Sequence, residues 1–331
     1  MKNITYGIIG IVGLVIIGVL IATLQSGQES NDKLRIAYFA NIGHLVPIVG
    51  LEQGLFSEAL SDIVDVDVYL FDSGPQAIES LFANSIDLAY VGPGPAINGY
   101  VKSDGKLRII TGSASGGTSL VGIDESIKGI TDLDGKKVSS PQLGNTQDIS
   151  LRHNLKENGL KGMRFGGTVT IHNVANPDTY TLFAKGDIDA AWVPEPWATI
   201  LVKELNGTRV FREETLWSDE RFASVVLVGK SEYIEKNEDI IKRWVQVHEE
   251  IVSWINENPL EAKEIFHSFM YKTYGKTIPD YIIDEAMNNL EITSELNKES
   301  IITFAQRADE LGYLGRDGYS LEEIFWEGKL P

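Results

Sequence analysis

Two stretches of this chain, about a hundred residues apart, repeat one pattern. They read LFANSIDLAYVGPGPA from Leu81 to Ala96 and LFAKGDIDAAWVPEPWA from Leu182 to Ala198. In each copy a helix end, Leu-Phe-Ala, leads through a turn and Ile-Asp into a short apolar strand, and prolines follow where the next helix would begin. The repeat therefore predicts two lobes of similar α/β design, and a chance likeness between two ordinary connections is the alternative.

Short apolar runs alternate with helical stretches over most of the chain. The runs predicted as strands lie at 35–39, 66–71, 87–91, 107–112, 119–123, 136–140, 169–174, 189–193 and 224–229. Alternation of this kind predicts an α/β fold with largely parallel sheets. Beyond residue 230 the spacing becomes helical, and we assign its apolar stripe to the core rather than to a ligand platform. The stripe comprises Trp244, Val247, Ile251, Trp254 and Ile255.

The N-terminal segment 4–24 is apolar and uncharged, and it is long enough for a helix to cross a hydrocarbon layer of ~30 Å. We interpret it as a membrane anchor. A cleaved signal peptide is the alternative, although residues 22–24 fit a cleavage site poorly. Because Lys2 precedes the segment, the positive-inside tendency places the rest of the chain outside the cytoplasm. The polar residues 25–33 are typical of a linker.

The composition excludes several classes of function. The chain has no cysteine, which rules out disulfides, thiolate metal sites, a thiol nucleophile and a lipid-modified cysteine. Its formal net charge is −18 at pH 7, which would repel a phosphate backbone, so no nucleic acid is expected as a partner. The five histidines lack metal-ligand spacing, so no catalytic metal is expected. No cofactor is predicted either.

Glycine-rich loops follow two of the predicted strands, GPGPAING at 92–99 and TGSASGGTS at 111–119. Such loops bring backbone N–H groups close to a ligand. Neither has the spacing of a nucleotide-binding loop, and Ala114 stands where a nucleophile elbow needs serine. Nucleotide binding and serine hydrolase chemistry are therefore unsupported.

The stretch PQLGNTQDISLRHNL at 141–155 leads from a predicted strand into a helix. Asn145 or Thr146 is a suitable cap, and Asp148 stands in the first turn. In open α/β sheets ligands bind outside the carboxyl ends of strands, where helix starts present free amides. A helix start directed at a ligand is one interpretation, and a cap that serves the helix alone is the other.

Three further side chains follow predicted strand ends. His44 stands in the loop after the first strand, where a surface histidine is the alternative to a ligand contact. Glu195 and Trp197 lie just past the strand at 189–193 and could hydrogen-bond to a small molecule and stack on it. Structural roles remain open for both.

Five stretches together resemble the substrate-binding proteins of ABC importers for aliphatic sulfonates, nitrate and taurine. They are RIAYFANIGHLVPIVGLEQGLF, IDLAYVGPGPAINGYVKSDG, ITGSASGGTSLVG, ITDLDGKKVSSPQLGNTQDISLR and IDAAWVPEPWA. The resemblance implies a type II periplasmic-binding-protein fold, in which two α/β lobes joined by two crossing strands close on a small molecule, with a helix-rich C-terminal region. It implies an anchor or signal and linker over 1–30, lobe I over 31–118 and 225–331, and lobe II over 119–224.

Matching motifs also imply a set of ligand contacts. These are Asn41, His44, Ser73, Gly94, Ser113, Ser115, Thr146, Gln147, Asp148, Glu195 and Trp197. We hypothesise that an oxyanion head group, a sulfonate or a similar anion, lies against the amides near Thr146 and the hydroxyls of Ser113 and Ser115, while Trp197 packs on the rest of the ligand. Neutral dipoles, rather than cations, would then hold the anion.

The function implied is that of an extracytoplasmic solute-binding protein of an ABC importer, and not that of an enzyme. It would capture a small anionic organic molecule, a sulfonate, taurine or similar, by closure of its two lobes and deliver it to the permease. One alternative is an enzyme of the same fold that acts on a thiamin-pyrimidine-like substrate; that branch relies on a cysteine-rich motif, which this chain lacks. An acid–base enzyme using His44, Asp148 and Glu195 is a further possibility. A membrane-tethered ligand sensor is the remaining alternative.

Overall fold

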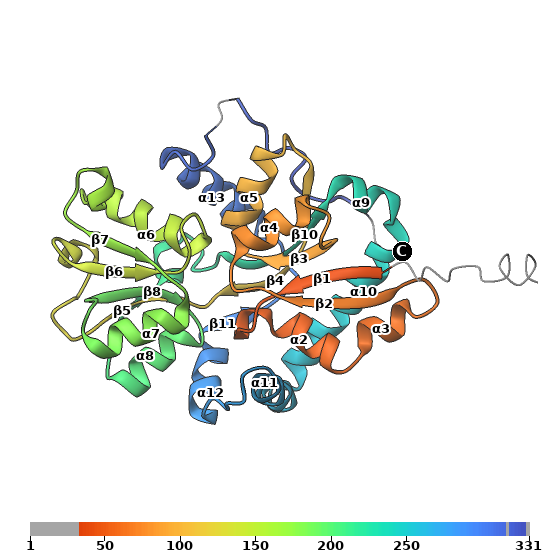
Figure 1. The fold of residues 1–331 in the computed structure, drawn as a ribbon, viewed down its shortest axis with the longest axis horizontal. Coiled ribbons are helices and arrows are strands. Elements are labelled where there is room, and N and C mark those ends of the chain that lie inside the picture. Colours follow the sequence, from red (N-terminus) through yellow and green to blue (C-terminus); the bar gives the residue numbers. More distant parts are fainter. Residues whose placement is uncertain (1–32, 316–317, 329–331) are drawn as a thin grey trace, which may run out of the picture. The chain divides into compact units, whose positions relative to one another are not determined.

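The strands form two separate sheets in the computed structural model, which describes residues 33–315 and 318–328 (Figure 1). The first sheet has the order β11-β4-β10-β3-β1-β2, and the second has the order β7-β6-β8-β5-β9. We call the part of the molecule built on the first sheet lobe I and the part built on the second sheet lobe II. The segment predicted as a membrane anchor, 4–24, lies outside the described residues.

Lobe I contains the strands β1 (Lys33–Tyr38), β2 (Asp65–Leu70), β3 (Leu88–Val91), β4 (Leu107–Gly116), β10 (Ala223–Lys230) and β11 (Leu290–Ile292). Its helices in the first half of the chain are η1 (Ile42–His44), α2 (Leu45–Glu52), α3 (Leu55–Leu60), α4 (Gly74–Phe82) and α5 (Pro93–Lys102). Those in the second half are α9 (Ser231–Lys236), α10 (Glu238–Glu257), α11 (Pro259–Tyr274), α12 (Asp280–Asn288) and α13 (Lys298–Glu310).

Lobe II contains the strands β5 (Thr118–Gly122), β6 (Lys137–Ser140), β7 (Thr170–Asn173), β8 (Ala190–Pro194) and β9 (Thr208–Arg212). Its helices are η2 (Ile130–Leu133), α6 (Thr146–Glu157), η3 (Met163–Phe165), α7 (Asn176–Lys185), α8 (Trp197–Leu205) and η4 (Glu213–Leu216). None of the helices within 33–315 and 318–328 is both long and apolar enough to cross a membrane.

All nine predicted strands are present, but the expectation of largely parallel sheets is wrong. β1 pairs with β3, and β6 with β7 and β8, in parallel. The pairs β10–β3, β10–β4, β11–β4, β5–β8 and β5–β9 are antiparallel. The cause is the crossing between lobes, because β4 runs through Gly116 and Gly117 directly into β5, and β10 brings the chain back. Both glycines have positive φ, which a side chain would oppose.

The repeated phrase forms the same unit in each lobe, helix-strand-helix: α4-β3-α5 in lobe I and α7-β8-α8 in lobe II (Figure 1). The aspartate of Ile-Asp has one structural role in both copies. Asp87 accepts a hydrogen bond from the backbone N–H of Arg35 on β1 at 2.9 Å, and Asp189 accepts one from that of Lys137 on β6 at 2.7 Å. The repeat therefore reflects two equivalent parallel strand pairs rather than chance.

The C-terminal helices complete the core of lobe I. On α10, Trp244, Ile251 and Ile255 are buried, while Val247 and Trp254 are partly buried against the same cluster, which confirms the assignment of this stripe to the core. The Trp244 ring stacks on Phe56 with centroids 3.7 Å apart.

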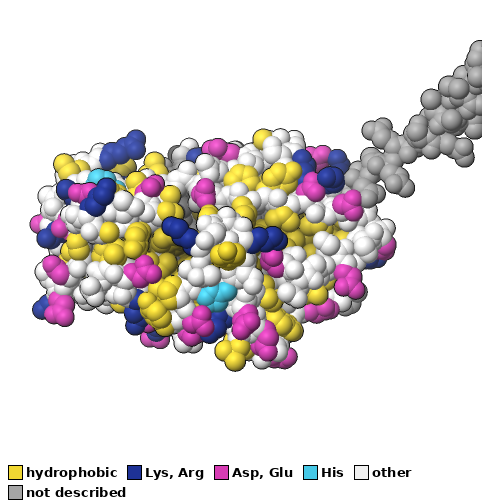
Figure 2. Space-filling view, turned by 60° about the horizontal axis from the view of Figure 1, so that its bottom comes forward, with side chains coloured by type: hydrophobic (Ala, Val, Ile, Leu, Met, Phe, Trp, Pro, Cys, Tyr) yellow, Lys and Arg dark blue, Asp and Glu magenta, His cyan; other side chains and the backbone are white. Residues whose placement is uncertain are grey.

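On the face of the molecule shown in Figure 2, acidic and basic side chains are interspersed, and the basic ones do not form a single patch.

Candidate ligand-binding site

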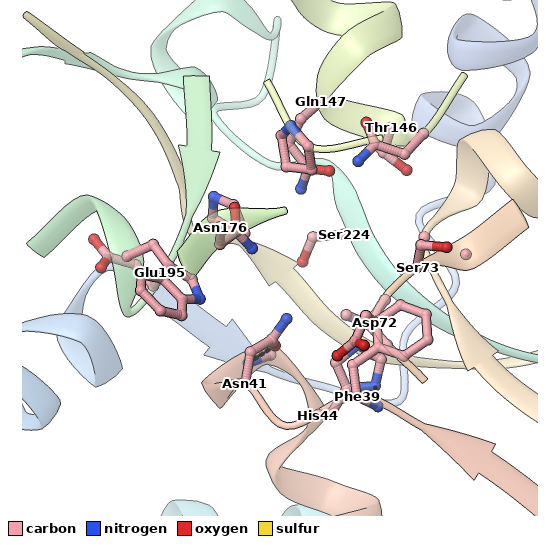
Figure 3. Close-up of a pocket in the computed structure, with 18 of the residues that line it drawn as sticks. Phe39, Asn41, His44, Asp72, Ser73, Thr146, Gln147, Asn176, Glu195 and Ser224 are labelled. Atoms are coloured by element: carbon pink, nitrogen blue, oxygen red, sulfur yellow. Dashed lines mark hydrogen bonds between the residues drawn. The ribbon is translucent and has the colours of Figure 1, made fainter. Parts of the chain in front are cut away.

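A cavity of about 370 Å³ is lined by residues of both lobes at the carboxyl ends of their strands. Helices from each lobe begin at its wall, so several helix N-termini converge on one space (Figure 3). The residues at these starts are Gly74 of α4, the cap Gly92 of α5, Thr146 of α6, Asn176 of α7 and Trp197 of α8. Each N-terminus carries a partial positive charge, so the wall favours hydrogen-bond acceptors and anions.

Seven of the eleven predicted contacts line this cavity. They are Asn41, His44, Ser73, Thr146, Gln147, Glu195 and Trp197. The other four, Gly94, Ser113, Ser115 and Asp148, do not line it. Sequence reasoning thus identified the loops that meet at the cavity, but it did not distinguish their inward-facing side chains from their buried ones.

Lobe I contributes Asn41, His44 and Ser73. The Asn41 Oδ1 atom accepts a hydrogen bond from the N–H of Gly43 at 3.0 Å and so caps η1. His44 is buried, and burial lowers its pKa to about 3, so the ring is neutral at physiological pH. Its Nδ1 atom accepts from the N–H of Phe39 at 3.3 Å. The Ser73 Oγ atom is buried without a hydrogen-bond partner in the described chain.

The start of α6 shows which of the two candidate residues is the cap. The Asn145 Oδ1 atom accepts from the N–H of Asp148 at 2.8 Å, so Asn145 caps the helix and Thr146 is its first residue. Thr146 instead accepts, through Oγ1, a hydrogen bond from the N–H of Gly94 at 3.1 Å. Gly94 therefore contacts the opposite lobe directly.

Asp148 serves the structure of the loop before α6. Its carboxylate is fully buried and accepts hydrogen bonds from five groups. The donors are Arg152 Nε, Asn173 Nδ2, Ser140 Oγ, the N–H of Gly144 and the hydroxyl of Tyr313. Since all of its acceptor capacity is engaged, Asp148 has none left for a ligand.

Glu195 lines the cavity but directs its carboxylate away from it (Figure 3). Its Oε1 atom accepts from Arg209 Nη1 and from Asn289 Nδ2, each at 2.9 Å, and its Oε2 atom accepts from the N–H of Thr199 at 3.0 Å. This buried ion pair positions the start of α8. Trp197, at that start, lines the cavity.

The two serines of β4 lie away from the cavity. The Ser113 Oγ atom is buried without a hydrogen-bond partner in the described chain, and Ser115 is also buried. The crossing residues Gly116, Gly117 and Thr118 line the cavity in their place. The hypothesis that the serine hydroxyls hold an anion therefore has no support in this geometry.

Several lining residues were missed by the sequence analysis. They are chiefly aromatic and polar side chains: Phe39, Phe71, Asp72, Asn176, Ser224 and Tyr274. Phe71 and Asp72 directly follow β2, and Asn176 follows β7 within three residues, so the rule that ligands bind past strand ends could have found them. No local signal marks Tyr274, which ends α11 far along the chain.

Outside the cavity, His153, Glu157 and Glu310 offer ligand atoms within 4.8 Å of one another. His153 and Glu157 lie one turn apart on α6, and Glu310 ends α13. Glu310 is already paired with Lys156 at 2.9 Å. A cation at this surface would compete with that lysine.

The fold is that of periplasmic binding proteins. The periplasmic aliphatic sulphonate binding protein of Escherichia coli superposes with a TM-score of 0.71 at 20% identity, over 91% of this chain and 94% of that one. At this level of identity the likeness shows the fold alone. It confirms the predicted two-lobed α/β architecture.

The chain belongs to the NMT1-like family, whose model matches residues 27–268. A protein of Brucella abortus named as a binding protein is 28% identical over 80% of this chain and 78% of its own length. A protein of Bacillus subtilis named as binding aliphatic sulfonates is 22% identical over 92% of this chain and 89% of its own length. The predicted resemblance to importer binding proteins is thereby confirmed.

Proposed function

We propose that this protein is the extracytoplasmic solute-binding component of an ABC importer. The observation that carries the proposal is the cavity itself, because it draws helix starts from both lobes and so changes shape whenever the lobes move. The family and the names of the relatives support the same function. Its partners would be a small molecule and a permease.

The protein would capture its ligand by closing the two lobes around it. A micromolar ligand contributes about −8 kcal/mol, and only the part specific to the closed form shifts the open-to-closed equilibrium. Amides at the helix starts, together with Asn41, Thr146 and Gln147, would hold the polar part of the ligand, and Trp197 would pack on its carbon skeleton. The permease would recognise the closed shape.

The net charge of −18 does not forbid an acidic group on the ligand. Screening over roughly 8 Å at physiological salt weakens the electrostatic field of the whole protein, whereas hydrogen bonds act at contact.

We also propose that lobe I comprises residues 31–118 and 225–331 and lobe II residues 119–224, and that segment 4–24 attaches the protein to the membrane. Release into a periplasm after cleavage of a signal peptide is the alternative to this attachment.

The enzymatic alternative loses its acid–base groups. The carboxylates of Asp148 and Glu195 are engaged by buried partners. Burial lowers the pKa of His44 to about 3, so near pH 7 its ring is a poor proton acceptor and is not present as the protonated acid. Relatives named as binding proteins favour capture without chemistry. Recovery of a chemically altered ligand after prolonged incubation would support the enzyme instead.

Isothermal titration calorimetry of residues 31–331 tests the proposal. Alkanesulfonates, taurine, nitrate and thiamin pyrimidines are the probes, and Trp197→Ala and Thr146→Ala are compared with the parent and with Tyr281→Ala, an exposed aromatic away from the cavity. We expect the two cavity variants to bind the best probe at least tenfold more weakly. Parent-like binding by both would place the ligand elsewhere.

A further inference from the structure

We propose, on the basis of the function proposed above, that the ligand is a small zwitterion whose ammonium group pairs with Asp72 while its acidic group faces the helix starts of lobe II. Each end of the ligand would then contact a different wall of the cavity. It rests on the charges, the unpartnered polar atoms and the aromatic side chains at that wall.

The first observation is the charge of the lining. None of the described residues that line the cavity is a lysine or an arginine. His44 is neutral, and the nearby cation Arg209 is engaged by Glu195 on the far side of the wall. An anionic ligand would therefore meet amide dipoles but no side-chain cation, whereas a positive group would meet carboxylates.

The second observation concerns those carboxylates. Three line the cavity, Asp72, Asp178 and Glu195, and only Glu195 has a basic partner among the described residues. Asp72 points its carboxylate into the cavity (Figure 3). Phe39, Phe71 and Tyr274 also line the cavity, and the faces of aromatic rings attract cations too. The charge of Asp72 contributes to raising the pKa of Tyr274, after burial, which shows how near the two groups lie.

The third observation is a pair of unpartnered polar atoms. Ser73 Oγ in lobe I and Asn176 Oδ1 in lobe II are both buried, line the cavity and have no hydrogen-bond partner in the described chain. Buried polar atoms are nearly always hydrogen-bonded, so a ligand is the natural partner. The Asn176 oxygen can only accept, which calls for an N–H or O–H on the ligand.

The opposite wall suits the acidic end. The first residues of α6 and α8, Thr146 and Trp197, line lobe II's side of the cavity, and helix N-termini favour negative charge. A zwitterion that spans from Asp72 to these starts places each charge against its complement. A cavity of about 370 Å³ has room for a molecule of this size.

Matched pairs of probes test the proposal on the full chain. We would measure the binding of taurine against ethanesulfonate and of β-alanine against propionate, by thermal shift and calorimetry. The amine-bearing member of at least one pair should bind tenfold or more tightly than its partner. Asp72→Asn should abolish that preference, while Asp219→Asn, which makes the same charge change at an exposed site away from the cavity, should retain it.

The outcomes separate the two proposals. Tighter binding of ethanesulfonate or propionate than of their amine partners, with sensitivity to Trp197→Ala, would leave the solute-binding function standing and overturn the zwitterion. A preference for the amine that survives Asp72→Asn would overturn the role of Asp72. If no probe of either pair or of the wider set bound, the proposed function would fall as well.

Discussion

The Thr146 hydroxyl of lobe II accepts a hydrogen bond from the amide of Gly94 in lobe I at 3.1 Å. This close approach is possible because Gly92 and Gly94 have no side chains. A methyl group on Gly92 would lie 2.3 Å from Thr146 Oγ1, and one on Gly94 would lie 3.0 Å from the backbone nitrogen of Thr146. The GPGP stretch therefore forms a contact between the lobes as well as opening α5 at the cavity wall.

Gly92→Ala should hold the lobes apart. Gly92 has a φ of −72°, so alanine fits its backbone and the added methyl group mainly disturbs the contact with Thr146. We expect affinity for the best ligand to fall about tenfold, which corresponds to about 1.4 kcal/mol, and the ligand-saturated protein to have a larger radius of gyration in X-ray scattering. Gly129→Ala is the control, because a methyl group there meets open space. Parent-like closure and affinity in Gly92→Ala would refute the role of this contact.

Arg209→Met should destabilise the protein strongly. The substitution leaves the buried Glu195 carboxylate without its cation, which costs about 3–5 kcal/mol of unfolding free energy. Arg221→Met removes solvent-accessible pairs with Glu291 and Glu295 and should cost less than about 1 kcal/mol. Urea denaturation of both variants measures the difference. Equal, small losses would mean that the Glu195–Arg209 pair contributes little.

Acid should destabilise the protein through two buried histidines. Burial lowers the pKa of His248 to about 4 and that of His44 to about 3. Below about pH 6.5 the unfolded chain binds protons at these rings that the folded chain does not, so stability falls as the pH drops toward 4. His248 alone accounts for about 3 kcal/mol of that loss. His248→Gln should lower stability at pH 7, since the bonds to Tyr90 and Gly112 change, yet give a flatter decline in acid. A decline as steep as the parent's would contradict this assignment.

Glu213 should act in the opposite direction. Burial raises its pKa to about 6, and its carboxylate accepts from Ser150 Oγ and Trp192 Nε1. Between about pH 4.5 and 6 the folded chain binds a proton that the unfolded chain has lost, so this group's contribution decreases as pH rises through 6. Removing it in Glu213→Gln should make stability climb more steeply over that range. An unchanged slope, measured by urea titrations at pH 4.5 and 6.5, would argue against a raised pKa.

The strands show how far local patterns reach. Each apolar run that was predicted as a strand is a strand in the structure. A short run of apolar residues is a local signal, because a strand that packs against a core needs apolar side chains whatever its neighbours are. β9, with the sequence TRVFR, and the three-residue β11 were missed because they are short and only partly buried. Their pairing with β5 and β4 is a property of the assembled sheets and leaves little trace in the segments themselves.

Whether neighbouring strands run parallel or antiparallel could likewise not be predicted from local patterns. Alternating strands and helices favoured parallel pairing, which holds for β1–β3, β6–β7 and β6–β8. The strands that enter a sheet by crossing from the other lobe, β5 and β10, run antiparallel to their neighbours there. A pair of glycines marks a flexible point in a sequence but does not say that the chain changes sheet there.

The sequence by itself determined the two-lobed architecture and the loops that meet at the cavity, because strand periodicity and residues past strand ends are local features. Only the tertiary structure decided which residues of those loops line the cavity. Asp148 and Glu195 look like ligand contacts in sequence, yet Arg152, Asn173 and Arg209 engage them. The sequence gives the charge and chemical type of each side chain. Which partner binds a buried carboxylate depends on which segments of the chain pack beside it.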